Sequence, residues 1–267
     1  MRAFIVNLDS ATDRWAFVEA GFAKSRLILC RVAAVNGKSL TLPHAQYSER
    51  LYRWLHGRTP NVRELACYLS HLKAIEAFLA TDEEHALIGE DDLVLRPDFD
   101  TALEEAMKYA CYWNILRVTG LRRGRPAPLV RLCGDYFLCV SFGRLKGAGG
   151  YVIDRVAAAA FLERLLPMRL PFDHAFDREW VMALRAACIA PFPASQTESP
   201  FLSSVQPGTY PKLSWKHRCL TTYSYQASNE IGRWLFRGGS YLRFKLFDKH
   251  RRLEGLGRDR QRQRSAR

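Results

Sequence analysis

The stretch Ala86-Leu87-Ile88-Gly89-Glu90-Asp91-Asp92 joins a short apolar run directly to three carboxylates. A run of this length and composition is typical of a strand buried in a sheet, and the acids mark the point where the strand leaves the core. Open α/β sheets bind their ligands at the carboxyl ends of such strands. The stretch therefore predicts a buried strand with a ligand site at its end.

The three acids are expected to point in different directions. Side chains alternate along an extended chain, which places Glu90 and Asp92 on one side and Asp91 on the other. Two converging carboxylates suit a hard divalent cation, Mn²⁺ or Mg²⁺, that keeps open positions for the oxygens of a diphosphate. The alternative is a solvated loop whose acids cap the next element, and the triplet alone leaves it open.

The rest of the chain alternates between strand-like and helix-like patterns. Short apolar runs predict strands over residues 3–8, 27–35, 113–118, 135–142, 151–153 and 189–192. Capping signals and helical recurrence predict helices from about residue 12 and over residues 64–80, 99–112, 154–166 and 171–187. Residues 41–59 show no period, and residues 120–132 are expected to form a loop. The alternation indicates an α/β fold.

The positive charge of the chain is concentrated at its C-terminal end. The 267 residues include 40 Lys and Arg against 27 Asp and Glu, a net charge of +13. Residues 212–267 hold 15 of these basic groups and 4 of the acids, a net charge of +11, which leaves residues 1–211 near neutrality. We therefore expect a globular domain over 1–211 and a basic, aromatic-rich extension over 212–267, with about the last ten residues disordered.

Cysteine usage and hydropathy indicate the compartment. The seven cysteines are an odd number, and none of them forms a CxxC pair. This pattern excludes a fully paired disulfide framework and favours reduced thiols in a reducing compartment. The first apolar run is too short for a secretory signal, and no apolar run is long enough to span a membrane. We expect a cytoplasmic protein.

A second polar segment precedes the acidic triplet by about twenty residues. Within the predicted helix over 64–80, Glu64 and His71 are seven residues apart, and Ser70 and Lys73 are three apart. Both spacings place the members of a pair on one helix face. Taken alone, His71 is better interpreted as a core or surface histidine with a satisfied ring, and Lys73 as part of a solvated helix face.

These segments together resemble glycosyltransferase family 25, the bacterial lipooligosaccharide-biosynthesis transferases. The matching motifs occur in order over roughly residues 3–205: Asn7-Leu8 with Asp13-Arg14, the turn at 34–37, the helix at 64–71, the strand and acids at 87–92, Tyr151-Val152-Ile153, and Pro171-Phe172-Asp173. Two positions depart from the family pattern. Ala66 replaces a glycine, and Gly89 stands where a branched apolar residue is usual, which is expected to loosen the strand.

The resemblance implies a single Rossmann-like nucleotide-sugar transferase domain of the GT-A type, with UDP-galactose as the usual donor. In such a domain Glu90 and Asp92 would hold Mn²⁺ or Mg²⁺. The residues implied around the donor are Asn7, Leu8, Arg14, Val35, Asn36, Gly37, Ser70, His71, Lys73 and Asp91.

An inverting transfer also requires a base that takes the proton of the acceptor hydroxyl. Asp173 is the candidate, with Asp177 one helical turn later as the second choice. Asp is also a favoured helix N-cap, so capping is an equally good interpretation of Asp173.

The resemblance implies that the acceptor is a phosphate-rich, lipid-linked oligosaccharide at the inner face of the cytoplasmic membrane. We therefore expect the basic extension to contact this anionic surface. Two competing functions remain. One is nucleic-acid binding through the extension, against which the neutral body and the lack of a recognisable binding module argue. The other is a catalytically inactive scaffold of the same family, against which the intact acidic triplet argues.

Overall fold

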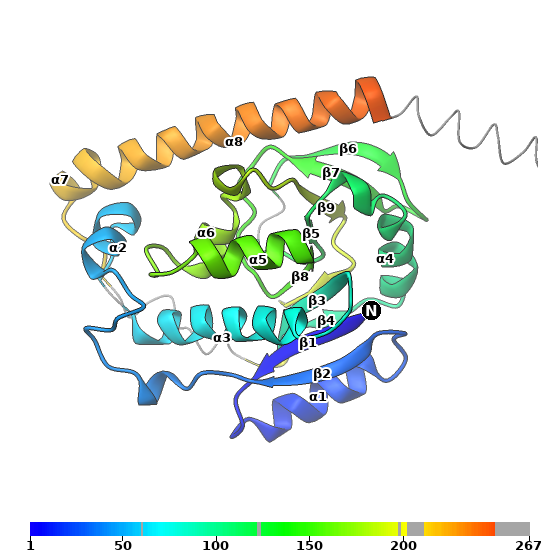
Figure 1. The fold of residues 1–267 in the computed structure, drawn as a ribbon, viewed down its shortest axis with the longest axis horizontal. Coiled ribbons are helices and arrows are strands. Elements are labelled where there is room, and N and C mark those ends of the chain that lie inside the picture. Colours follow the sequence, from blue (N-terminus) through cyan, green and yellow to red (C-terminus); the bar gives the residue numbers. More distant parts are fainter. Residues whose placement is uncertain (60, 122–123, 197–198, 202–210, 249–267) are drawn as a thin grey trace, which may run out of the picture.

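The computed structural model describes residues 1–59, 61–121, 124–196, 199–201 and 211–248 (Figure 1). Within these residues, eight strands form one mixed sheet in the order β2-β1-β3-β8-β5-β9-β7-β6. The strands are β1 (Arg2–Asn7), β2 (Ile28–Ala33), β3 (His85–Glu90), β5 (Ile115–Arg117), β6 (Pro126–Arg131), β7 (Phe137–Ser141), β8 (Gly150–Asp154) and β9 (Ala186–Ala190). A small antiparallel pair, β4 (Val94–Leu95) with β10 (Ala194–Ser195), lies beside this sheet.

The register of the first three strands determines where the acids lie. Strand β1 runs parallel to both β2 and β3, with Asn7 opposite Ala33 and Val6 opposite Glu90. The carboxyl ends of β1, β2 and β3 therefore meet at one edge of the sheet. The predicted α/β fold is confirmed, and the sheet is mixed because β8 runs antiparallel to both β3 and β5.

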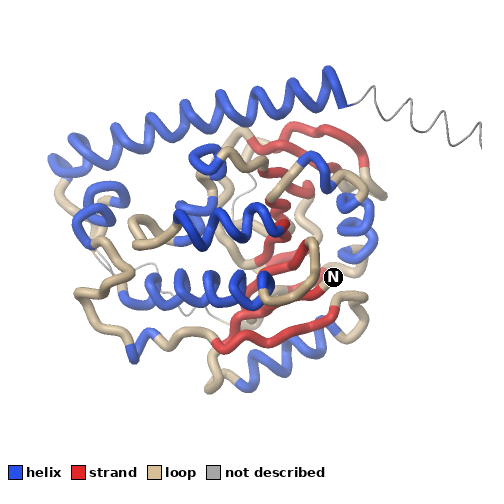
Figure 2. Tube along the Cα trace, viewed as in Figure 1, coloured by secondary structure: helices blue, strands red, loops and turns tan. Residues whose placement is uncertain are grey.

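Helices cover both faces of the sheet, and Figure 2 shows the strands running through the middle of the molecule. Phe4 and Val6 of β1 pack into one apolar cluster, and Ala3 and Ile5 pack into the other, as alternation along a strand requires. The first cluster contains residues of α2 (Glu49–His56), α3 (Val62–Leu79), α5 (Arg155–Arg164) and α6 (Phe172–Phe176). The second contains residues of α1 (Thr12–Phe22) and α4 (Phe99–Met107).

Helix α3 carries polar side chains to the end of β3. It begins where the side chain of Asn61 accepts a hydrogen bond from the amide of Arg63, and it agrees with the predicted helix to within two residues. Leu65, Leu72 and Phe78 are buried in the first cluster, which fixes the rotation of the helix about its axis.

Three segments differ from the prediction. The helix predicted over 171–187 is wrong: α6 ends at Phe176, a 3₁₀ turn follows over Glu179–Met182, and residues 186–190 form β9 inside the sheet. The start at Pro171-Phe172-Asp173 predicts a helix, but the segment ends in β9, which pairs with both β5 and β7, and sheet pairing overrides intrinsic propensity. The strand predicted over 189–192 overlaps the end of β9. The loop expected over 120–132 contains β6, and residues 41–59 contain α2.

Gly89 lies in a closely packed part of β3. A Cβ atom at this position would lie 2.8 Å from Cδ1 of Ile5 and 3.1 Å from Cδ2 of Leu93. These side chains would have to shift to admit the branched residue that is usual in the family. Glycine here lets the packed core approach the backbone one residue before Glu90.

The C-terminal segment packs against the body. Helix α7 (Trp215–Arg218), the π-helical turn η4 (Cys219–Tyr223), α8 (Ser224–Arg243) and a second π-helical turn, η5 (Phe244–Asp248), form one long helical rod across the molecule (Figure 1). Arg237 is buried and binds both Asp177 and Glu179, at 2.9 and 2.6 Å. The described part of the extension is thus held by buried ion pairs, while the ten terminal residues expected to be disordered lie outside the described residues.

The cysteines and helices agree with the expected physical character of the chain. All seven cysteines are free thiols, as the odd, scattered pattern predicted. Among the described residues, the structure has no helix that combines the length and apolar character needed to cross a membrane.

Replacing Arg237 by Ala is expected to lower the free energy of unfolding by about 3–5 kcal/mol, because Glu179 and Asp177 would be left as underneutralised buried charges. Urea denaturation measures this loss. Arg243→Ala, at an exposed position of the same helix, should change stability by no more than about 0.5 kcal/mol. Equal effects of the two substitutions would show that the buried cluster does not hold α8.

Candidate functional site

The acidic triplet lies at the end of β3 with the predicted division of directions. Glu90 is the last residue of the strand, and Asp91 and Asp92 form the turn that follows, both buried. The side-chain amide of Gln196 donates hydrogen bonds to Glu90 Oε2 at 3.0 Å and to Asp92 Oδ1 at 2.8 Å. Glu90 and Asp92 therefore converge on one point, while Asp91 has different partners.

Asp91 is held by the end of β1 and the start of α1. Asn7 Nδ2 donates to one carboxylate oxygen at 2.7 Å, and Arg14 Nη1 lies 2.8 Å from the other. Arg31 from β2 in turn donates to Asn7 Oδ1 at 2.6 Å. These contacts link the three parallel strands at the edge where they end.

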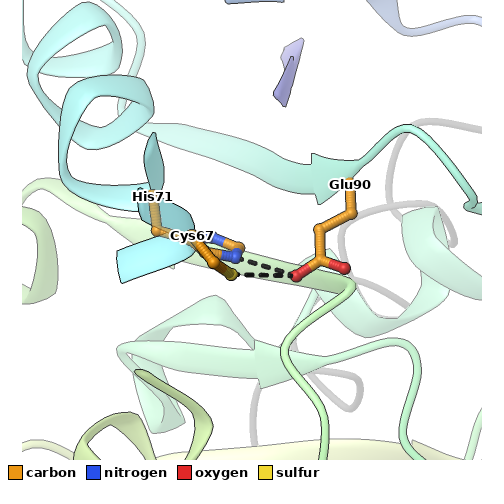
Figure 3. A group of neighbouring side chains, drawn as sticks. All are labelled: Cys67, His71 and Glu90. Carbon is orange, nitrogen blue, oxygen red and sulfur yellow. Dashed lines mark hydrogen bonds and ion pairs between the residues drawn. The ribbon is translucent and has the colours of Figure 1, made fainter. Parts of the chain in front are cut away.

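On the other side of Glu90, helix α3 contributes Cys67 and His71, as Figure 3 shows. His71 Nε2 lies 3.1 Å from Glu90 Oε1, and the Cys67 thiol lies 3.7 Å from the same oxygen. An ionised carboxylate only accepts hydrogen bonds, so His71 Nε2 is the donor to Glu90. His71 Nδ1 lies 3.2 Å from the hydroxyl of Tyr151.

The ring of His71 is also fixed by stacking. It lies parallel to the ring of Phe172 at a centroid distance of 4.2 Å, and its side chain is fully buried. Phe172 is the first residue of α6 and precedes Asp173. This stack connects the acids at β3 to the segment that carries the predicted base.

Burial acts on the two converging acids with different outcomes. Burial alone would raise the pKa of Glu90, but hydrogen bonding and charge from His71, together with the Gln196 amide, lower it below its usual value. Burial and the neighbouring charge of Glu90 raise the pKa of Asp92 to about 7. Asp91 also has a raised pKa, chiefly because it is buried. Two of the three carboxylic acids therefore hold their protons more tightly than usual, because burial and like charge disfavour their ionised forms.

Two groups of side chains, both of which include Glu90, offer atoms that could coordinate a metal ion. Glu90 and Asp92 offer oxygens to a hard cation such as Mn²⁺ or Mg²⁺, and the amide of Gln196 can turn its own oxygen toward the same point. The second set is Cys67, His71 and Glu90, whose donor atoms all lie within 4.8 Å of one another. Its sulfur and nitrogen suit a softer ion such as Zn²⁺. Glu90 and Asp92 are the residues that the sequence predicts as metal ligands, and their binding of a metal stays a prediction.

Ser70 and Lys73 of α3, which are predicted to bind the nucleotide-sugar donor, contact the chain at the end of β2 and not the acids. Ser70 Oγ accepts the amide proton of Val35 at 2.8 Å. Lys73 Nζ donates to the carbonyl of Ala33 at 2.8 Å and is exposed. Both side chains thus fix the path of the chain as it leaves the sheet.

The predicted turn after β2 lies against the first turns of α3. Asn36 accepts a hydrogen bond from the amide of Lys38, and a Cβ atom added to Gly37 would meet Arg63 and Ala66 at ordinary contact distance. The carbonyl of Leu8 accepts from Arg31. The structure therefore gathers the predicted donor residues along one edge of the sheet, in two groups: Asn7, Leu8, Arg14, His71 and the acids in one, and Val35, Asn36, Gly37, Ser70 and Lys73 in the other.

Asp173 is not the N-cap of α6, because Pro171 occupies the capping position. Its Oδ2 accepts the amide proton of Gly147 at 3.2 Å. Burial would raise the pKa of Asp173, but His174, the Gly147 amide and Arg117 together lower it. The charge of Asp173 helps to raise the pKa of Cys67, after burial and Glu90, so the two groups are electrostatic neighbours.

Asp177 does not fit the prediction that it serves as a second base. Its carboxylate is buried and binds Arg237 at 2.9 Å and Arg233 at 3.0 Å. A base must offer a lone pair to the acceptor hydroxyl, whereas both oxygens of Asp177 accept from guanidinium groups of α8. α6 ends one residue before Asp177, so the side chain turns toward that helix.

Three residues of the site were not assigned from the sequence: Cys67, Tyr151 and Gln196. The spacing of four between Cys67 and His71 is a signal for a shared helix face, but the apolar neighbours of Cys67 suggested a core thiol. Gln196 lies more than a hundred residues after the acids that it bridges. No local pattern predicts such a contact.

Comparison with known proteins confirms the family resemblance in the N-terminal part. Residues 1–125 match the family described as glycosyltransferase family 25 (LPS biosynthesis protein). Among solved structures, mannose-1-phosphate geranyltransferase from Thermus thermophilus is similar, with 15% identity and a TM-score of 0.33 over 73% of this chain. The chain spans 60% of the length of that structure. No curated protein matches.

Replacing Asp92 by Asn is expected to stabilise the metal-free protein by about 1–3 kcal/mol at pH 8. The raised pKa of Asp92, about 7, means that the folded state binds this proton more tightly than the unfolded chain does. Wild-type stability relative to Asp92→Asn should therefore fall as the pH rises from about 4 to about 7 and then level off. Thermal melting across this range, in the presence of chelator, measures the difference.

The exposed Asp82→Asn is the matched control, and it should follow the wild type at every pH. If Asp92→Asn loses stability at pH 8, then Asp92 makes a favourable interaction that outweighs the repulsion from Glu90.

Proposed function

We propose that this chain, whose residues 1–125 match glycosyltransferase family 25, is a metal-dependent glycosyltransferase with a GT-A type fold. It transfers a hexose, with galactose as the first candidate, from a UDP-sugar to a lipooligosaccharide or related surface-glycan acceptor, with inversion at the anomeric carbon. The observation that carries this proposal is the convergence of Glu90 and Asp92 at the edge where β1, β2 and β3 end. Nucleotide ligands of open α/β sheets bind at this kind of edge.

The donor diphosphate requires compensation of its charge. Glu90 and Asp92 would hold Mn²⁺ or Mg²⁺, and the bound cation would stabilise the charge that develops on the departing UDP. Asn7 and Arg14 bind Asp91, whose carboxylate therefore does not join Glu90 and Asp92. Only two of the three acids would then act as ligands of the cation. His71, fixed by Phe172 and Tyr151, positions the carboxylate of Glu90. These contacts preorganise the site before the donor arrives.

Asp173 is the base of the proposed reaction. The low pKa of Asp173 keeps its carboxylate ionised, and the Gly147 amide orients it. In the transfer step the acceptor hydroxyl gives its proton to Asp173 while its oxygen bonds to the anomeric carbon. The bond from that carbon to the UDP oxygen breaks, and the electron pair leaves with UDP.

Loss of Asp92 or Glu90 should abolish transfer. We expect Asp92→Asn and Glu90→Gln to lower the turnover of the preferred donor by at least about 10³-fold, because the cation loses a ligand. The measurement is UDP release from UDP-galactose, UDP-glucose and their N-acetyl forms, with Mn²⁺ present or chelated. Asp82→Asn should keep full activity. Turnover that survives both chelation and Asp92→Asn would rule out the metal-dependent mechanism, and absence of UDP binding by the wild type would favour an inactive scaffold.

Asp173→Asn tests the base separately from the donor site. Asparagine can still accept the Gly147 hydrogen bond, so the fold and the metal-dependent binding of UDP should persist while transfer falls by about 10²–10⁴-fold. Calorimetric titration with UDP and Mn²⁺ measures binding, and UDP release with acceptor measures transfer. Asp135→Asn, at an exposed position, is the control. Unchanged transfer by Asp173→Asn would show that another group takes the proton.

A further inference from the structure

Helix α8 presents its faces in the reverse of the usual order. A surface helix normally buries apolar residues and exposes polar ones. In α8 the buried side chains are Asn229, Arg233 and Arg237, whereas Ile231 and Leu235 are 62% and 72% exposed. The polar face is turned toward the body and the apolar face toward solvent.

The apolar face continues beyond α8 at both ends. We call it the outer stripe, and it consists of Leu220, Ile231, Leu235, Leu242 and Leu246, all more than half exposed. Spacings of four, seven and eleven residues place side chains on one face of a helix. Eight of the thirteen large apolar side chains that are exposed in the described part of the chain lie between residues 215 and 246. The patch is therefore concentrated on this one rod.

The buried ion pairs hold the helix in this orientation. Arg233 and Arg237 bind Asp177 and Glu179 in the interior, and Arg237 also donates to the carbonyl of Ser141. Turning α8 to bury the outer stripe would leave these acids without cations inside the protein, which is costly. The ion pairs therefore hold the stripe facing outward. Exposed apolar side chains that gather on one face of a protein mark an interaction site.

Charge identifies the partner. Residues 215–246 of the rod contain one acidic residue, Glu230, and its carboxylate is paired with Arg144 and Arg233. Lys212, Lys216 and Arg243 are exposed on the same segment, and the sequence continues over 249–267 with eight basic and two acidic residues. A second copy of the chain would bring like charges together. An anionic lipid surface offers both opposite charge and an apolar layer.

We propose that the outer stripe is a membrane-docking surface, on which the rod lies parallel to an anionic phospholipid bilayer with its leucines among the acyl chains. Trp215 and Trp234, both exposed, occupy the level of the headgroups, where tryptophan is favoured. The sequence already indicates membrane contact through the charges and aromatics of the extension, with residues 231–247 compatible with an interfacial helix. What the structure adds is that the apolar face of this helix is turned away from the body. This proposal does not depend on the transferase activity.

Co-sedimentation of the full chain with vesicles tests the proposal. The vesicles contain equal parts of phosphatidylglycerol and phosphatidylcholine, or phosphatidylcholine alone. The test variant is Ile231→Gln with Leu235→Gln, which keeps every charge, and its matched control is Ile28→Gln with Val156→Gln, at exposed apolar positions elsewhere. We expect the wild type and the control to bind the anionic vesicles and the stripe variant to bind at least about tenfold more weakly.

Circular dichroism and thermal melting should be the same for the variants, because all four positions are exposed. Equal binding by the stripe variant and the wild type would overturn the proposal, because the basic residues would then account for the binding without the apolar face. A wild type that is dimeric, becomes monomeric in the stripe variant and ignores vesicles would overturn it in favour of self-association. A blue shift of tryptophan fluorescence with anionic vesicles, absent in the stripe variant, would support it further.

Discussion

The carboxylate of Glu90 is the point on which the candidate site depends. Its Oε1 accepts hydrogen bonds from the imidazole of His71 and the thiol of Cys67, and its Oε2 accepts one from the amide of Gln196. A buried carboxylate is costly unless it is hydrogen-bonded, so each of these contacts contributes to keeping β3, α3 and the segment after β10 together. The stack of His71 on Phe172 then extends the same constraint to α6. A single ionised group thereby fixes the relative positions of four segments that are distant in sequence.

The same site shows a conflict between stability and chemistry. Asp92 sits beside Glu90 with a pKa raised by burial and by that neighbouring charge, an arrangement that the folded protein tolerates but does not gain from. Buried like charges of this kind are common where a cation or a developing charge must be bound.

Local patterns in the sequence predict the elements that carry the acids. The apolar run before Glu90, the first strand and helix α3 each have a clear signal, and the direction of the three acids follows from alternation alone. Segments whose structure depends on distant partners are predicted less well. Only the end of β9 falls in the predicted strand over 189–192, because its pairing with β5 and β7 leaves no local signal, and Gln196 meets Asp92 only in the folded chain. A count of arginines likewise cannot distinguish Arg233 and Arg237, which neutralise interior acids, from arginines that face solvent.

The anchoring of α8 limits how this protein can be shortened. A chain that ends before α8 would lose the exposed leucines and much of the positive charge, and the loss of the leucines by itself would favour solubility. It would also strip the cations from Asp177 and Glu179, which lie just beyond α6 and therefore close in sequence to Asp173. The solubility of the chain and the integrity of the segment that carries Asp173 are in this way tied to the same twenty-residue helix.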